Sequence, residues 1–234
     1  VEFMRREFGM TLVEFCDSVG MLGPKTVLVH TVWLTPPEIA RLAQTGTSIS
    51  HNPSSNTKLA SGFAPIPEML AAGVNVTLGC DGGPSNNSYD LIREMKLAAV
   101  VHKARTLNPL VVPAETVLEM ATIHGARALG LDSEIGSLEV GKKADFVVLN
   151  LDRPGLTPSP NPVSTLVYAA MGSDVETVVI DGRVVVQEDR LVTLDEEAVA
   201  AEARRRAADV YARAGVAIAP RGPGGEGSGE RAKP

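Results

Sequence analysis

Residues 74–83 read Val-Asn-Val-Thr-Leu-Gly-Cys-Asp-Gly-Gly. The first five residues are mostly β-branched or apolar and predict a strand over 74–78. Asp81 follows this strand almost directly, and the glycines beside it let the backbone approach closely. A helix predicted over 66–72 ends at Gly73, so a helix leads into the strand. This order of helix, strand and polar loop predicts one unit of a parallel α/β sheet, in which sites lie at the carboxyl ends of the strands.

The same alternation runs through the first 130 residues. The helix predicted over 35–46 begins at the possible cap Thr35, with Pro36 at its first position and Glu38 where a capping box needs a carboxylate. The other elements predicted here are a helix over 1–19, a buried strand Thr26–His30, a strand Thr47–Ser50 and a long helix Ser88–Arg105. Strands that alternate with helices predict a parallel sheet with crossover helices, and therefore the α/β fold class.

The pattern changes after about residue 130. Asp181-Gly182 separates two β-branched runs, which predicts a hairpin with a type I′ turn. The other elements predicted here are a helix over 113–129, a strand Asp145–Leu149 and a helix from the cap Asp195 to Ala212. The chain therefore divides into an α/β part over 1–130, a small β part over 131–194, a helix over 195–214 and a disordered Gly/Pro-rich tail over 215–234.

Charge and cysteine content exclude some classes of partner. The 234 residues carry 22 Lys and Arg against 28 Asp and Glu, a net charge of −6. This balance argues against nucleic acid and anionic membrane surfaces as partners. The two cysteines, Cys16 and Cys80, are too few for a disulfide scaffold and predict a reducing, cytoplasmic setting. We find no apolar run of membrane-spanning length and no signal-peptide pattern.

The four histidines do not form a complete metal site by spacing. None belongs to a His-x-His or His-x-x-Glu pair, whereas a mononuclear site needs three or four protein ligands. His30 ends a predicted strand, where a core histidine and a functional one are about equally expected. His51 begins a loop of side chains that bond their own backbone, so a structural hydrogen-bonding role stands beside a catalytic one. His102 and His124 are predicted to be structural.

The loop over 79–87 is the other candidate. Asp81 could be a carboxylate held at a strand end for chemistry, or simply the first residue of a turn. The two glycines after it suggest a phosphate cradle only weakly, because no Lys follows at P-loop spacing. Cys80 is interpreted as a small packing residue rather than a nucleophile.

Three strand-end motifs now stand in order: Val-His-Thr-Val-Trp-Leu over 29–34, Ser-His-Asn-Pro-Ser-Ser-Asn over 50–56 and Leu-Gly-Cys-Asp-Gly-Gly-Pro-Ser-Asn-Asn over 78–87. With the stretch 136–149, they closely resemble the amidohydrolase superfamily. The nearest branch holds chlorohydrolases and aminohydrolases, including S-adenosylhomocysteine/5-methylthioadenosine deaminases, triazine hydrolases and guanine deaminases. The resemblance covers residues 1–194. It implies the C-terminal part of a (β/α)8 TIM barrel, with strands six to eight inside 1–130, and the C-terminal strands of a small β-sandwich over 131–194.

The resemblance also implies roles for individual residues. Asp81 matches the aspartate on the last barrel strand that binds the metal and takes a proton from water. His30 matches the sixth-strand histidine that contacts this water and the intermediate. Ser85, His51 and Trp33 match positions near the substrate, His51 only as a supporting group and Trp33 where many members have a second histidine. The implied cofactor is one divalent metal, zinc first and iron second.

The implied reaction is hydrolysis of a C–N bond other than a peptide bond, with deamination of a purine-like or heteroaromatic small molecule. The family's first-strand His-x-His and fifth-strand His-x-x-Glu are absent, and the chain starts with Val rather than Met. We therefore expect a truncated chain that is inactive alone and holds no zinc tightly, from a protein that forms a homo-oligomer at full length.

Three alternatives remain open. The first keeps hydrolysis and changes the substrate to a triazine or a cyclic amide. The second is a non-catalytic chain that completes a barrel with a partner carrying the His-x-His half. The third is a bare fragment with no independent role, which predicts poor solubility because strand edges would be exposed.

Overall fold

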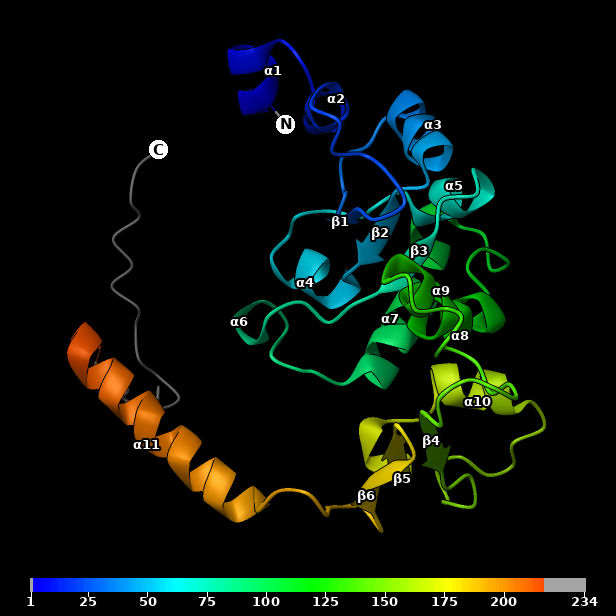
Figure 1. The fold of residues 1–234 in the computed structure, drawn as a ribbon, viewed down its shortest axis with the longest axis vertical. Coiled ribbons are helices and arrows are strands. Elements are labelled where there is room, and N and C mark those ends of the chain that lie inside the picture. The colour runs from blue at the N-terminus through cyan, green and yellow to red at the C-terminus, as the bar shows by residue number, and fades with distance from the viewer. Residues whose placement is uncertain (1, 217–234) are drawn as a thin grey trace. The chain divides into compact units, whose positions relative to one another are not determined.

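The computed structural model describes residues 2–216 (Figure 1). The chain separates into two compact units, with the boundary between Arg190 and Leu191. The further division predicted at residue 130 stays a prediction. The predicted disordered tail over 215–234 lies, except for residues 215 and 216, outside the described residues.

A parallel sheet forms the centre of the first unit, as predicted. Its strand order is β1-β2-β3, with β1 at Val27–Val29, β2 at Ser48–His51 and β3 at Val76–Leu78. Both neighbouring pairs are parallel. Helix α3 (Pro36–Thr45) connects β1 to β2, and α4 (Pro53–Lys58) and α5 (Ile66–Ala71) connect β2 to β3. Parallel strands require such crossovers, so the carboxyl ends of all three strands meet at one edge of the sheet.

The predicted strands need correction. The strand predicted over 74–78 begins at Val76, and the strand predicted over Thr47–Ser50 spans Ser48–His51, whose last residue pairs with Leu78. The strand predicted as buried over Thr26–His30 is only partly buried, and Val29 is 50% exposed. The reason is its place in the sheet: among the described residues, β1 pairs with β2 alone and therefore has an open edge.

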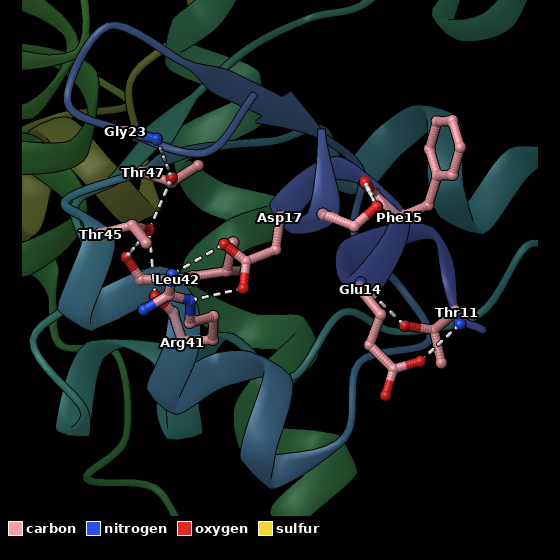
Figure 2. A network of polar contacts seen from close by, with 10 residues as sticks. Thr11, Glu14, Phe15, Asp17, Gly23, Arg41, Leu42, Thr45 and Thr47 are labelled. Carbon is pink, nitrogen blue, oxygen red and sulfur yellow. Dashed lines mark hydrogen bonds and ion pairs between the residues drawn. The ribbon is translucent and has the colours of Figure 1, made fainter. Parts of the chain in front are cut away.

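The predicted helix over 1–19 is two helices, α1 (Glu2–Phe8) and α2 (Leu12–Ser18). Gly9 leaves the helical conformation with a φ of 66°. Thr11 then starts α2 with a capping box, because the Glu14 amide donates to the Thr11 hydroxyl at 3.2 Å and the Thr11 amide donates to the Glu14 carboxylate at 2.7 Å. Each bond satisfies a donor that the start of a helix leaves free. Figure 2 shows this box at one end of α2.

A bidentate ion pair joins α2 to α3. The Arg41 guanidinium donates to both carboxylate oxygens of Asp17, at 2.7 and 2.8 Å (Figure 2). Hydrogen bonding to Arg41 lowers the pKa of Asp17. In the same view, Thr47 accepts from the Gly23 amide at 2.9 Å and lies 2.9 Å from the Thr45 hydroxyl. These contacts attach the N-terminal helices to the first crossover.

The later helices also differ from their predicted bounds. Helix α7 (Leu91–Thr106) starts after the cap Asp90, whose carboxylate accepts the Ile92 amide at 2.9 Å, and not at Ser88. The predicted helix over 113–129 is divided into α8 (Ala114–Ala121) and α9 (Ile123–Ala128), because the backbone of Thr122 leaves the helical region, with φ −128° and ψ −95°. The short helices α6 (Gly83–Asn86) and α10 (Pro162–Tyr168) were not predicted.

The main core lies between β2, β3 and the surrounding helices. Helix α10 packs against α7 and α8, and α8 packs against β3. Its large, fully buried apolar side chains come from three helices and two strands: Leu42, Ile49, Ile66, Met69, Val76, Val117 and Met120. Burial of each such side chain contributes about 1.5–3 kcal/mol, so this core holds the sheet edge that carries the polar loops.

The strand order of the second sheet is β4-β5-β6-β7, and its pairs β4–β5 and β5–β6 are antiparallel. Its strands are β4 (Phe146–Leu149), β5 (Val175–Ile180), β6 (Arg183–Gln187) and β7 (Arg190–Leu191). The predicted hairpin is confirmed by the pairing of Ile180 with Arg183. Asp181 and Gly182 have φ values of 50° and 73°, and a type I′ turn requires positive φ at both central residues.

The second unit contains α11 (Glu196–Ala214), which starts at the predicted cap Asp195 and continues two residues past the predicted end at Ala212. Two of its exposed arginines pair with acids on the same helix, Arg205 and Arg206 with Glu202 and Arg205 also with Asp209. In the described part of the chain, no helix is long and apolar enough to cross a membrane.

Candidate functional site

The carboxyl edge of the parallel sheet brings the two main candidates together. His30 follows β1 and Asp81 follows β3, and both take positive φ values, 68° and 61°. Left-handed backbone is uncommon for residues other than glycine and is found most often at turns and functional sites. These sharp turns direct both side chains toward one point, where the His30 Nε2 lies 3.9 Å from the Asp81 Oδ2.

Two hydrogen bonds hold the Asp81 carboxylate. The Ser55 hydroxyl donates to Oδ2 at 2.5 Å, and the Gly82 amide donates to Oδ1 at 2.7 Å. The pKa of Asp81 is lowered, first by the Ser55 hydrogen bond and then by the Gly82 amide. Donors to the charged form stabilise it, so Asp81 is a carboxylate at neutral pH with lone pairs left to bind a cation or a proton.

His30 is held from its other ring nitrogen. Its Nδ1 lies 2.9 Å from the Oδ1 of Asn56, which is buried, while the His30 side chain is 41% exposed. Asn56 and Ser55 are neighbours in α4, the helix that follows the middle strand. One turn of α4 therefore touches both His30 on one side and Asp81 on the other.

A hollow of about 370 Å³ opens over this pair, lined by His30, Ser55, Asn56, Leu59, Ser61, Asp81 and Ser85. A second hollow of about 340 Å³ shares His30 and Ser61 with it and includes Trp33. Ser85 thus lines the same hollow as the His30–Asp81 pair, and Trp33 lines the neighbouring hollow that also contains His30. Trp33 is 70% exposed. Contact of either residue with a substrate stays a prediction.

His51 lies beneath this edge and not on its surface. Its side chain is buried, and its Nε2 lies 3.0 Å from the Nε2 of His102 on α7. Burial lowers the pKa of both rings, that of His102 to about 4, so both are neutral at pH 7. These contacts match the structural hydrogen-bonding role that was one alternative for His51, and a direct contact with substrate stays a prediction.

The structural roles predicted for the other two histidines are confirmed. His102 is fully buried against His51. The Nδ1 of His124 lies 3.0 Å from the carbonyl oxygen of Val76 in β3. A carbonyl only accepts hydrogen bonds, so this ring donates through Nδ1.

Glu94 on α7 anchors both polar loops and was missed by sequence reasoning. It is 1% exposed, and it accepts the Asn86 side-chain amide at 2.6 Å and the Ser54 backbone amide at 3.3 Å. The same Asn86 nitrogen donates to the Cys80 carbonyl at 2.7 Å. Glu94 therefore ties the loop that carries Asp81 to the start of α4.

An exposed lysine makes a second link between these loops. Lys58, at the end of α4, donates to the Pro84 carbonyl at 2.7 Å and also to the Asn87 side chain. Burial raises the pKa of the Cys80 thiol, which disfavours the reactive thiolate form. This agrees with its interpretation as a packing residue.

The roles of Ser55 and Asn56 were also missed. The stretch over 50–56 was interpreted as an ordered loop, but helix α4 begins at Pro53. Asn52 before Pro53 is a usual cap followed by the usual first residue of a helix. That signal predicts the helix, whereas contacts across 26 residues to His30 and Asp81 have no local signature.

The donor atoms at the edge suit a divalent metal in kind but not in number. Carboxylate oxygen and neutral imidazole nitrogen are both zinc ligands, and Asp81 Oδ1 and Oδ2 and His30 Nε2 supply them. Among residues 2–216, no group of three or more His, Cys, Asp or Glu side chains is placed to hold a metal ion. The described residues therefore fit part of a ligand set.

The family comparison agrees with the geometry. The model of the amidohydrolase family matches residues 1–185 of this chain. The chain belongs to the amidohydrolase family. The resemblance predicted from the three strand-end motifs is thereby confirmed.

Other members are similar over most of this amidohydrolase chain. A 5′-deoxyadenosine deaminase of Methanothermobacter thermautotrophicus is 50% identical over 188 residues, which are 80% of this chain and 44% of that protein. A 5-methylthioadenosine/S-adenosylhomocysteine deaminase of Syntrophobacter fumaroxidans is 49% identical over 80% of this chain and 43% of that protein. The amidohydrolase chain thus spans less than half the length of these relatives.

Solved amidohydrolase structures have the same fold over the shared part. A zinc-bound adenosine deaminase from Xanthomonas campestris superposes with a TM-score of 0.89 and 36% identity, covering 91% of this chain and 48% of that chain. A zinc complex of atrazine chlorohydrolase from Arthrobacter aurescens superposes with a TM-score of 0.83 and 30% identity, covering 87% of this chain and 45% of that chain. Both likenesses support a mixed α/β amidohydrolase fold.

Proposed function

We propose that this chain supplies part of the active site of a metal-dependent deaminase that removes the amino group from an adenine-type nucleoside. The observation that carries the proposal is the Asp81 carboxylate, held by Ser55 and Gly82 and facing His30 at 3.9 Å. The deaminase names of relatives that are 49–50% identical support the choice of reaction and substrate class.

Asp81 would move the proton. In hydrolytic deamination, a water oxygen bonds to the ring carbon, the bond from that carbon to the amino nitrogen breaks, and ammonia leaves. The ionised carboxylate takes one proton from the attacking water and returns it to the departing nitrogen. Its lowered pKa keeps it ready to accept this proton at neutral pH.

His30 would contact the attacking water and the intermediate through its Nε2 and orient them as a hydrogen-bond acceptor. Ser85 and Trp33 would contact the substrate ring from the two hollows that meet at His30. His51 would support the edge from below through its bond to His102. Each of these roles is part of the proposal.

Asp81 would also hold the metal, with zinc favoured by the zinc-bound neighbours. A divalent ion, when bound, lowers the pKa of a water molecule toward neutrality. The remaining metal ligands would come from the part of the relatives that this chain does not match. The same part would supply the other strands of a TIM barrel and the rest of a β-sandwich. We propose that residues 1–234 alone are inactive for this reason.

A second candidate is hydrolysis of a substituent on a triazine ring. It is supported by the structural likeness to atrazine chlorohydrolase, at 30% identity. The deaminase relatives are closer in sequence, so deamination comes first. Cyclic-amide opening has no comparable support.

Product release separates these candidates. The natural protein that contains this chain and the 234-residue chain alone are each incubated with 5′-deoxyadenosine, 5′-methylthioadenosine and atrazine. We expect ammonia from the nucleosides with the natural protein, and none with the isolated chain. Chloride release from atrazine without ammonia from the nucleosides would favour the second candidate. Absence of every product from zinc-loaded natural protein would overturn both and favour a non-catalytic assembly role.

A further inference from the structure

Asn56 is buried, and among the described residues its side chain forms a hydrogen bond to His30 alone. Its side chain is 3% exposed, and its backbone amide donates to the Asn52 carbonyl at 3.0 Å inside α4. The helix fixes the backbone of Asn56, and burial restricts where its side-chain amide can lie. A fixed partner of this kind can decide which nitrogen of an imidazole carries the proton.

The contact between the two side chains is direct. Asn56 Oδ1 lies 2.9 Å from His30 Nδ1. A side-chain carbonyl oxygen only accepts hydrogen bonds, so Nδ1 donates in this orientation of the amide. A neutral imidazole has one N–H, and Nε2 is then left with its lone pair exposed toward the hollow.

The geometry on the other side of the ring is consistent with this tautomer. Nε2 lies 3.9 Å from Asp81 Oδ2, beyond hydrogen-bond distance. An Nε2–H that faced a carboxylate oxygen would be expected to form a hydrogen bond, with the nitrogen and oxygen about 3 Å apart. Two acceptor atoms form no hydrogen bond with each other and therefore stay farther apart. Asp81 Oδ2 already accepts from Ser55, so His30 and Asp81 both present lone pairs to the same point.

We infer that Asn56 is a positioning residue that fixes His30 as the Nδ1–H tautomer, so that its Nε2 remains an acceptor facing Asp81. Together with Ser55, it makes one turn of α4 responsible for the state of both groups. The use of this lone pair in deamination rests on the proposed function, but the tautomer itself does not.

The amide of Asn56 has two possible orientations, and they predict opposite tautomers. Its Nδ2 has no hydrogen-bond partner among the described residues. If the amide were rotated so that Nδ2 faced the ring, Nδ1 would accept and the proton would sit on Nε2. Ring nitrogen resonances distinguish these two cases without any measurement of activity.

The test is a two-bond ¹H–¹⁵N correlation spectrum of the uniformly ¹⁵N-labelled 234-residue chain at about pH 8.5, above the ordinary titration range of histidine. We expect Nδ1 of His30 to resonate as a protonated, pyrrole-type nitrogen and Nε2 as an unprotonated, pyridine-type nitrogen. His124 is the internal standard, because its Nδ1 faces the Val76 carbonyl and must also be protonated.

Two variants complete the test. Asn56→Leu removes the acceptor, and we expect the His30 resonances to lose this separation as both tautomers become populated. Asn56→Asp keeps an acceptor oxygen and should restore the Nδ1–H pattern. The His124 resonances should stay unchanged in both variants, which reports that the fold is retained.

Two results would overturn the inference. One is a pyrrole-type Nε2 of His30 in the parent chain, and the other is a His30 pattern that Asn56→Leu leaves unaltered while the His124 pattern is intact. If Asn56→Leu does not fold, the parent spectrum and Asn56→Asp still decide the question. Failure of the nucleoside assay leaves these spectra unaffected, so the two proposals fail separately.

Discussion

The dipeptide Asp-Gly occurs after β3, at Asp81-Gly82, and again between β5 and β6, at Asp181-Gly182. Both aspartates have positive φ, 61° and 50°. The side chain of Asp81 points into an open hollow and accepts from Ser55. Asp181 is exposed in a two-residue turn and is held through its backbone amide, which donates to the Asp145 carboxylate at 2.5 Å.

The difference comes from how the strands on either side are connected. In an antiparallel hairpin the second strand follows the first directly, so the two turn residues serve to reverse the direction of the backbone. A parallel strand must continue into a crossover, and its end remains open beside the ends of its neighbours. The same two residue types therefore make a turn in one sheet and a held carboxylate in the other.

The largest expected effect is on catalysis. In the natural protein that contains this chain, Asp81→Asn should lower kcat by about 100- to 10,000-fold, because the amide cannot accept the proton. Asp181→Asn is the matched control, since asparagine also tolerates positive φ, and it should leave the rate of ammonia release at the parent value. Equal losses in the two variants would contradict the assignment of the chemistry to the parallel sheet.

The second prediction concerns the stability of the fold at acidic pH. All four histidines lie at or before residue 124, and none lies in the antiparallel sheet. Burial lowers the pKa of His102 from 6.5 to about 4 and lowers that of His51 as well. The unfolded chain therefore binds protons that the native chain does not, and stability present above pH 6.5 is lost as the pH falls toward 4. For His102 alone the loss over this range is about 3 kcal/mol.

Urea unfolding at about pH 7 and about pH 5 checks this, with an expected loss of about 2 kcal/mol from His102 over that interval. His102→Gln should lose less over the same interval, because one depressed histidine is gone. If His102→Gln lost as much stability over this interval as the parent, groups other than His102 would cause the loss. Carboxylates with lowered pKa values, such as Asp81, act at lower pH.

The third prediction compares packing in the two sheets. Val76 in β3 is 0% exposed and Val184 in β6 is 42% exposed. Val76→Ala should lower the free energy of unfolding by about 2 kcal/mol, through lost burial and a residual cavity. Val184→Ala should cost less than about 1 kcal/mol. Denaturant titration at neutral pH measures both, and similar costs would show that the two sheets bury their valines equally.

Sequence reasoning worked where the signal is local. The Asp181-Gly182 turn depends on two residues, and the capping signals of Thr35 and Asp195 on one helical turn each. The break at Gly9–Thr11 was missed, although Thr11 and Glu14 have capping-box spacing. The break at Thr122 has no such signal, because a single threonine weakens a helix only slightly and does not by itself predict a break.

The residues of the candidate site likewise divide into those that the sequence could indicate and those that only the folded structure shows. His30 and Asp81 could be named because each ends a predicted strand, and parallel strands bring their ends together. Glu94 could not, because a single acidic residue on a long helix is usually solvated, and only the folded chain brings Ser54 from 40 residues away to cover it. The partners of Asn56 and Ser55 likewise depend on where α4 sits between two other loops.

The smallest expected effect returns to the two Asp-Gly pairs. Gly182 has a φ of 73° and Gly82 a φ of −72°, and neither position crowds an added methyl group, since Gly182 has no neighbour within 4 Å and Gly82 only Pro84 at 3.9 Å. Backbone conformation alone should then decide. Gly182→Ala should lower the free energy of unfolding by about 1–2 kcal/mol, because the left-handed region is unfavourable for alanine.

Gly82→Ala should change the free energy of unfolding by less than about 0.5 kcal/mol, because the entropy lost by the unfolded chain offsets the weaker cap. Gly182→Asn should recover part of the stability lost in Gly182→Ala, since asparagine tolerates positive φ. Urea titration of the three variants measures these differences. Equal costs for the two alanine variants would mean that both pairs are ordinary turns, and the distinction between a turn aspartate and a held carboxylate would then rest on Asp81 alone.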